Sequence, residues 1–229
     1  MEREIAVERG MDNVEDIRQT YGRVLTGDTE GQKRFYQNKP ADTLFNQITA
    51  CKDTVFHVAA QKGSKEVLLA LLRMVPPPRR LELLKMKNIQ GNTILHEVAI
   101  TGNVEVADSL LRELLSSNGP TVTNEVDIGE IRKQILGDRN NLGETPLFRA
   151  AEFGKTAMVK YLAQLVEEAG NLHDHYRRDD GITILHSAVI GQNFGISICF
   201  HHLPTQLLLL LSLTRCSTWL SMQRQLFGY

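Results

Sequence analysis

Gly154-Lys155-Thr156 is the stretch whose residue types most resemble a phosphate-binding loop. Such a loop also needs a glycine five residues before its second glycine, directly after a strand, so that backbone N–H groups surround the phosphates. Position 149 is instead Arg149, inside an apolar pattern of helical period. The spacing therefore favours a helix-ending glycine at position 154 and argues against nucleotide hydrolysis.

Histidine and cysteine are the other side chains that could do chemistry. Four histidines lie in the C-terminal part without a Cys-x-x-Cys or His-Glu-x-x-His pattern: His173, His175, His201 and His202. Three cysteines are scattered, which is typical of a reducing compartment rather than a disulfide framework: Cys51, Cys199 and Cys216. We expect no catalytic residue, no metal and no cofactor. The start of the chain has no apolar run that would indicate a secretory signal.

One motif occurs four times and accounts for the regular part of the chain. It reads Gly-Asn-Thr-Ile-Leu-His-Glu-Val-Ala-Ile-Thr-Gly over residues 91–102, with further copies from positions 53, 143 and 181. The threonine can cap a helix and the final glycine can end it in a left-handed conformation. A second apolar helical pattern follows each copy. Neither helix is long enough to be stable alone, so we expect stacked helix pairs.

The repeated Thr-Pro-Leu-His…Ala-Ala…Gly pattern resembles the ankyrin-repeat signature. The resemblance implies an all-α solenoid of helix-turn-helix units with short, hairpin-like turns. It also implies that the motif histidines join loop and helix by hydrogen bonds, although Phe148 replaces the histidine in the third copy. The residues given these structural roles are Thr54, His57, Gly63, Thr93, His96, Gly102, Thr145, Pro146, Gly154, Thr183 and His186.

The pattern divides the chain into three parts. Residues 1–20 are a polar lead-in, either frayed or one weak helix, and residues 195–229 are a divergent apolar tail. Residues 21–194 form the repeat domain, with a degenerate first repeat, three clear repeats and a partial last one. An insert at 116–141 lengthens the distance between the copies at 91 and 143 beyond the usual repeat of about 33 residues. The isoleucines of this insert suggest a short helix packed on the stack. Residues 79–87 read as a linker with one helical turn or, less simply, a phosphate-binding patch.

The tail raises the question of a membrane. Residues 207–211 are five leucines, but a span needs roughly 20 apolar residues. Residues 203–220 remain as an alternative interfacial anchor. A net charge of −1 favours neither nucleic acid nor an anionic membrane.

Several details resemble plant ankyrin proteins that carry a C-terminal membrane segment called the PGG domain. They are the stretches at 87–93 and 180–188 and the long insert before residue 143. The resemblance implies a part in stress or defence signalling, in relatives usually found at membranes. No PGG sequence is recognisable here, so we expect a truncated or frame-altered product after about Asn193, with this chain cytoplasmic.

The remaining function is protein binding. In ankyrin arrays, the turn before each threonine and the inner-helix residues before each glycine line a concave face. A solenoid displays these positions without burying them, and Phe153 is the preferred anchor because aromatic side chains often dominate binding energy. The predicted partner-binding residues are Cys51, Asp53, Gln61, Lys62, Ile89, Gln90, Asn92, Ile100, Thr101, Asn141, Leu142, Glu144, Glu152, Phe153, Asp179, Asp180 and Ile182.

Overall fold

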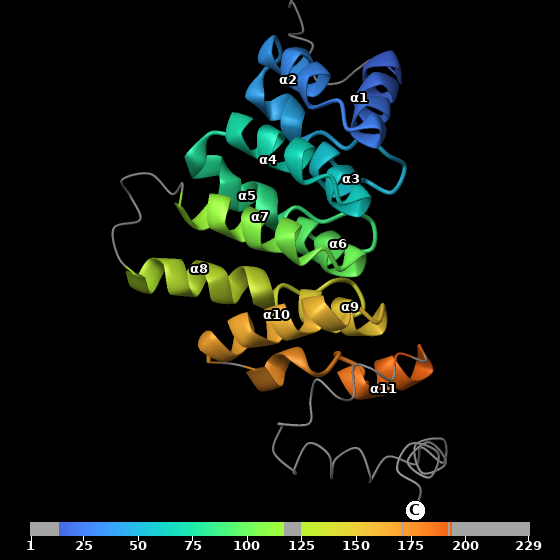
Figure 1. Cartoon of the computed structure of the whole chain (residues 1–229), viewed down its shortest axis with the longest axis vertical. Helices are drawn as coiled ribbons and strands as arrows, with labels where there is room; N and C mark the ends of the chain where they lie inside the picture. Colours follow the sequence, from blue (N-terminus) through green and yellow to red (C-terminus); the bar gives the residue numbers. More distant parts are fainter. Residues whose placement is uncertain (1–13, 117–124, 171, 192, 194–229) are drawn as a thin grey trace, which may run out of the picture.

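The computed structural model describes residues 14–116, 125–170, 172–191 and 193, and over these ranges the fold is all-α. Paired helices follow one another along a stack, from blue to orange in Figure 1. The pairs are α1 (Val14–Thr26) with α2 (Thr29–Gln37), α3 (Val55–Lys62) with α4 (Lys65–Met74), α6 (Ile94–Thr101) with α7 (Val104–Ser116), and α9 (Pro146–Glu152) with α10 (Thr156–Glu168); α11 (Ile184–Ile190) follows.

The helices form two columns. In the first column α1 contacts α3, and contacts continue from α3 to α6, from α6 to α9 and from α9 to α11. In the second column α2 contacts α4, α4 contacts α7, and α10 contacts α7. Each short helix therefore buries its apolar face on the preceding and following pairs, as the repeated pattern predicts.

Capping side chains determine where the first-column helices begin. The Thr54 side chain accepts a hydrogen bond from the backbone N–H of His57, one of the groups that a helix start leaves unpaired. Pro146 occupies the first position of α9, where its missing N–H costs nothing. These positions agree with the roles that the motif predicts for threonine and proline.

Glycines of positive φ end the same helices. Gly63, Gly102 and Gly154 have φ of 70°, 77° and 68°, and Gly27 has φ of 73° after α1. Hydrogen bonds from Ser64 N to Ala59 O and from Lys155 N to Ala150 O close two of these ends. The predicted helix-ending role of glycine is confirmed at Gly63, Gly102 and Gly154.

Replacing Gly102 by valine should therefore lower the free energy of unfolding by about 2 kcal/mol, since a β-branched residue adopts positive φ at high cost. The new Cβ would also stand 2.7 Å from Cδ of Lys155, a flexible side chain that can move. Urea unfolding measures the loss. Gly22→Val, at a helical position with no atom within 4 Å of a new Cβ, is the control and should change stability by less than about 0.5 kcal/mol. Equal melting temperatures for Gly102→Val and the unmodified chain would contradict this prediction.

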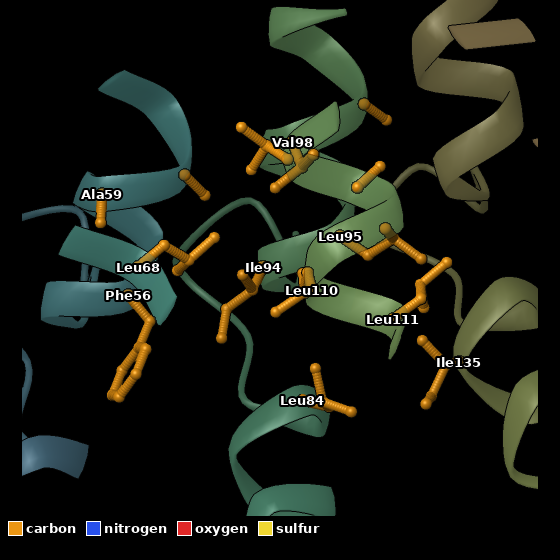
Figure 2. Packing of buried hydrophobic residues seen from close by; sticks show 14 of the residues in the cluster. Phe56, Ala59, Leu68, Leu84, Ile94, Leu95, Val98, Leu110, Leu111 and Ile135 are labelled. Carbon is orange, nitrogen blue, oxygen red and sulfur yellow. The ribbon is translucent and has the colours of Figure 1, made fainter. Parts of the chain in front are cut away.

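Apolar side chains from successive pairs meet in one continuous core. Phe56, Leu68, Ile94, Leu95 and Leu110 are at most 1% exposed, and Figure 2 shows them between neighbouring helices. Close packing of this kind makes each pair depend on the next, because a single pair would expose one side of its apolar surface.

Two extra helices fit among the repeats. The short helix α5 (Arg80–Lys85) contacts α6, and α8 (Glu125–Gly137) contacts both α9 and α10. Figure 1 shows α8 between α7 and α10. Ile135 and Leu136 are buried, which confirms the helix expected in the insert. Three 3-10 turns complete the described elements: Ala41–Phe45, Pro77–Arg79 and Leu172–His175.

The two ends of the stack differ in detail from the sequence-based boundaries. Helix α1 begins at Val14, within the range assigned to the lead-in, and it buries Thr20 and Val24. At the other end, Asn193 N donates to Ala188 O at 2.7 Å, in the register of the earlier helix ends, although Gly191 comes one residue early. Residues 1–13 and the predicted apolar tail lie outside the described residues.

Candidate functional site

Four turns precede the first-column helices, and each is closed by a backbone hydrogen bond. Glycine of positive φ occupies the fourth position of three turns, at Gly91, Gly143 and Gly181. The first turn is one residue longer, and Lys52 takes the equivalent place directly before its last residue, with φ of +60°. The closing N–H···O pairs are Ile48 to Asp53 (2.7 Å), Asn88 to Asn92 (3.0 Å), Asn140 to Glu144 (2.9 Å) and Arg178 to Ile182 (2.8 Å).

Lys52→Gly should stabilise the chain by about 0.5 kcal/mol. Glycine relieves a left-handed strain of about 1–2 kcal/mol but loses about 0.5–1 kcal/mol to its greater freedom when unfolded. The thermal midpoint should rise by roughly 1–2 °C, measured by circular dichroism. Lys62→Gly, an exposed helical position, is the control and should lower stability. A lower midpoint for Lys52→Gly would contradict the strain.

Neighbouring turns are joined by hydrogen bonds between their tips. Ile89 N donates to Cys51 O at 2.8 Å, and Asn141 N donates to Gln90 O at 3.0 Å. The Asn141 amide also donates to Ile89 O at 2.9 Å. These bonds join the first three tips, and a Cβ on Gly143 would stand 2.8 Å from the backbone N of Asp179, which places the fourth tip next to the third. We call the tips together the turn-tip row: Cys51, Lys52, Ile89, Gln90, Asn141, Leu142, Asp179 and Asp180.

Three residues predicted to contact a partner lie below the row instead. Asp53, Asn92 and Glu144 are 5%, 3% and 0% exposed. Each is the last residue of its turn, where the side chain points into the stack and joins a polar network. Asn88 links Asp53 to Glu97, and Asn140 links Asn92 to Glu144, all at 2.8–3.0 Å. These three side chains hold the turns together, and we leave them out of the candidate surface.

Glu144 is the charged centre of this network. Its carboxylate accepts hydrogen bonds from Arg178 Nη1 at 3.1 Å and from Arg149 Nη1 at 3.4 Å. Arg149 of α9 and Arg178 of the last described turn thus neutralise a fully buried carboxylate, as burial of charge requires. Arg149 also bonds to Glu152, and its guanidinium lies 4.8 Å from the ring centroid of Phe153. The network therefore connects the turns to the end of α9.

The other predicted contact residues remain accessible. Cys51, Gln61, Lys62, Ile89, Gln90, Asn141, Leu142, Phe153, Asp179 and Asp180 are exposed, whereas Ile100, Thr101, Glu152 and Ile182 are partly buried. We call the members at the ends of the first-column helices the helix-end group: Gln61, Lys62, Ile100, Thr101, Glu152 and Phe153. The row and the group adjoin, because Gln61 bonds to Asp53 and Arg149 links Glu144 to Phe153.

Large apolar side chains are exposed on this surface. Ile89 is 51% exposed, Leu142 53% and Phe153 45%. Such side chains, when clustered, mark interaction sites more often than scattered ones do. The sequence analysis did not identify Lys52, Arg149 or Arg178 as residues of this surface. For Lys52 a signal was available, because it aligns with the turn glycines of the other three copies.

The motif histidines join turns and helices as the resemblance implies. Nδ1 of His96 accepts from Thr93 N at 3.1 Å, and Nε2 lies 2.9 Å from the backbone oxygen of Glu144 in the next turn. His57 repeats this arrangement with Asn92 O at 3.1 Å. In the third copy Phe148 is buried, and the Thr145 hydroxyl itself donates to His175 O at 3.4 Å. In this copy, the hydrogen bond to the following segment is therefore made by Thr145 instead of a histidine.

Burial lowers the pKa of His96 from 6.5 to about 3, and burial also lowers the pKa of His57. Both ring nitrogens of His96 are engaged, so protonation would break a bond from Thr93. Below pH 6.5 the unfolded chain binds a proton that the folded chain does not, and stability falls as the pH falls. We expect His96 to remove about 2 kcal/mol between pH 7.5 and pH 5.

Urea unfolding at several pH values measures this loss. The control is His96→Phe, because phenylalanine is the residue at this position in the third copy. In this variant the free energy of unfolding should change less with pH. Equal slopes for the two proteins would show that His96 titrates normally when folded.

The structure shows where some of the residues considered for phosphate and metal binding lie. Gly154 ends a helix with φ of 68°. Within the described ranges, no group of three His, Cys, Asp or Glu side chains is arranged to hold a metal ion. His201 and His202 lie outside those ranges. In the same part of the chain, no helix has both the length and the apolar character needed to cross a membrane.

Comparison with known proteins gives weak similarities. No family model matches the chain. Alpha-latrotoxin-Lh1a of Latrodectus hasselti and alpha-latrotoxin-Lg1a of Latrodectus geometricus are each 28% identical to it over 138 residues, which is 60% of this chain. The chain spans only 8% of the length of either relative.

Proposed function

We propose that this chain is a non-catalytic binding module, an ankyrin-type solenoid that binds another protein through its turn-tip row and helix-end group. The observation that carries the proposal is the exposure of Ile89, Leu142 and Phe153 on adjoining parts of one surface. Apolar and aromatic side chains in such positions are typical anchors of protein interfaces.

The rigidity of the surface supports the proposal. The first three tips are joined by backbone hydrogen bonds, and the Phe153 ring rests on Arg149, which is itself held by Glu144 and Glu152. A surface that is ordered before binding loses little conformational entropy when a partner arrives. We also propose a part in plant stress or defence signalling, and the support for this part is the motif resemblance alone.

The test compares the proteins retained by the immobilised chain and by a double variant, Glu152→Ala with Phe153→Ala. We expect the variant to lose at least tenfold in affinity for a partner identified with the unmodified chain. The matched control, Tyr21→Ala with Glu66→Ala, removes an exposed aromatic ring and an exposed carboxylate away from this surface. Equal affinity for all three proteins, with unchanged thermal melts, would remove this surface from consideration.

The alternative function, membrane association through residues 203–220, concerns residues outside those described. It predicts that the chain stays with membranes after a carbonate wash. Recovery in the supernatant would exclude the anchor.

A further inference from the structure

We infer that the partner contributes an extended peptide segment that lies along the turn-tip row with a defined charge order. Acidic residues of the segment face Lys52 and Lys62, two apolar residues three positions apart face Ile89 and Leu142, and basic residues face Asp179 and Asp180. This inference rests on the proposed function and specifies the partner of the same surface.

The spacing of the tips favours an extended chain. Hydrogen bonds between the tips put Ile89 and Leu142 on consecutive turns of one line. Stacked helices are about 8–10 Å apart. An extended chain of the polyproline-II type advances about 3.1 Å per residue with three residues per turn, so residues three positions apart face the same side. One repeat step therefore corresponds to about three residues of an extended partner, whereas a helix advances only about 4.5 Å over the same number.

The shape of the row points the same way. Each tip presents two side chains, so the row is narrow and its members succeed one another along the stack. A partner helix instead needs a groove that receives residues from several of its turns. A groove does exist between α2 and α4, lined in part by Lys65 and Arg73, but it lies on the second column and is not part of the turn-tip row.

The charges of the row and of the adjoining helix-end residue Lys62 change sign along the stack. The first turn and the end of α3 expose Lys52 and Lys62, and the two middle tips carry no charge. The last tip exposes Asp179 and Asp180, whose side chains are 73% and 47% accessible.

Arg139 and Arg178 pair with the carboxylates of the last tip but are shared with other acceptors. Arg139 pairs with Asp179 but also donates to the backbone oxygens of Asp174 and Arg177. Arg178 divides its guanidinium between Asp180 and the buried Glu144. The carboxylates therefore keep accessible oxygens. Exposed charges of this kind contribute more to the orientation of a partner than to its affinity.

The experiment selects binders from a displayed library of random 12-residue peptides on the immobilised full chain. We expect enriched sequences with apolar residues at positions i and i+3 between an acidic and a basic flank. A synthetic peptide of this kind is then compared by fluorescence anisotropy with one of the same composition and exchanged flanks. The exchanged peptide should bind at least fivefold more weakly.

Two charge variants test the orientation at separate ends of the row. Lys52→Glu with Lys62→Glu should reduce or reverse the preference between the two peptides. Asp179→Lys with Asp180→Asn should do the same, and asparagine keeps the oxygen that accepts from Ile182 N. Ile89→Ser with Leu142→Ser should weaken the peptide at least tenfold, whereas the control Tyr21→Ser with Leu25→Ser, on α1, should not.

Selected peptides with an apolar pattern at i, i+4 and i+7, affinity that does not depend on charge order, or no enriched peptide would each overturn the inference. The proposed function is judged separately. If the Glu152→Ala, Phe153→Ala variant loses its protein partner while no ordered peptide emerges, the surface binds a protein but not in the way inferred here. If that variant keeps its partner and no peptide emerges, both statements fail.

Discussion

Replacing Glu144 by leucine should lower the free energy of unfolding by about 3 kcal/mol, one of the two largest effects that we expect from a single substitution. The carboxylate is fully buried and bonds to Arg149, Arg178 and Asn140. Leucine fills a similar volume but removes the fully buried acceptor of Arg149, Arg178 and Asn140, and leaves the two arginines only their more exposed partners Glu152 and Asp180. The thermal midpoint should fall by roughly 10 °C, and urea unfolding gives the free energy directly.

Glu152→Leu is the matched control, because Glu152 also binds Arg149 but is partly exposed. It should cost less than about 1 kcal/mol. The double variant Glu144→Leu with Arg178→Leu removes both members of one pair and should recover part of the loss, since the unpaired charge is then absent. A loss below about 1 kcal/mol for Glu144→Leu alone would mean that the network does not hold the turns together.

Gly143→Ala should cost about 3 kcal/mol, more than a left-handed conformation alone explains. Gly143 has φ of +75°, and a Cβ there would stand 2.4 Å from Cγ and 2.8 Å from the backbone N of Asp179 in the next turn. Backbone cannot move aside as a flexible side chain can. The alanine would therefore separate two adjacent turns, and chemical unfolding measures the cost.

Gly181→Ala supplies the comparison within the same chain. Gly181 occupies the same place in the last described turn, with φ of +88°, but no described atom lies within 4 Å of the position that a Cβ would take there. The substitution should cost about 1 kcal/mol, which reflects the left-handed conformation alone. Equal losses at Gly143 and Gly181 would show that the close approach of the turns contributes nothing to stability.

Much of the fold follows from local sequence. Threonine as a helix cap, proline at a first helical position and glycine at a left-handed helix end act through backbone groups within a few residues of themselves. Thr54, Pro146 and Gly102 could therefore be assigned correctly without knowledge of any distant contact. The apolar period of Ile131, Ile135 and Leu136 predicted the inserted helix for the same reason.

The candidate surface was predictable only in part. The positions of Ile89, Leu142 and Phe153 follow from the motif register, and the structure exposes all three. The motif register placed Glu144 among them because it stands in the same turn. Its side chain instead turns inward, a choice that depends on the arginines available to neutralise it.

Local sequence was enough to specify the helix pairs, their caps and the turns between them, because each depends on conformational preferences and hydrogen bonds over a few residues. Which turn residues face inward and which face outward emerges only when the repeats are stacked. That division depends on partners far apart in the chain, such as Arg178 for Glu144 and Asn140 for Asn92. A buried polar group is stable only when such a partner is within hydrogen-bonding distance, and stacking of the repeats brings the partners together.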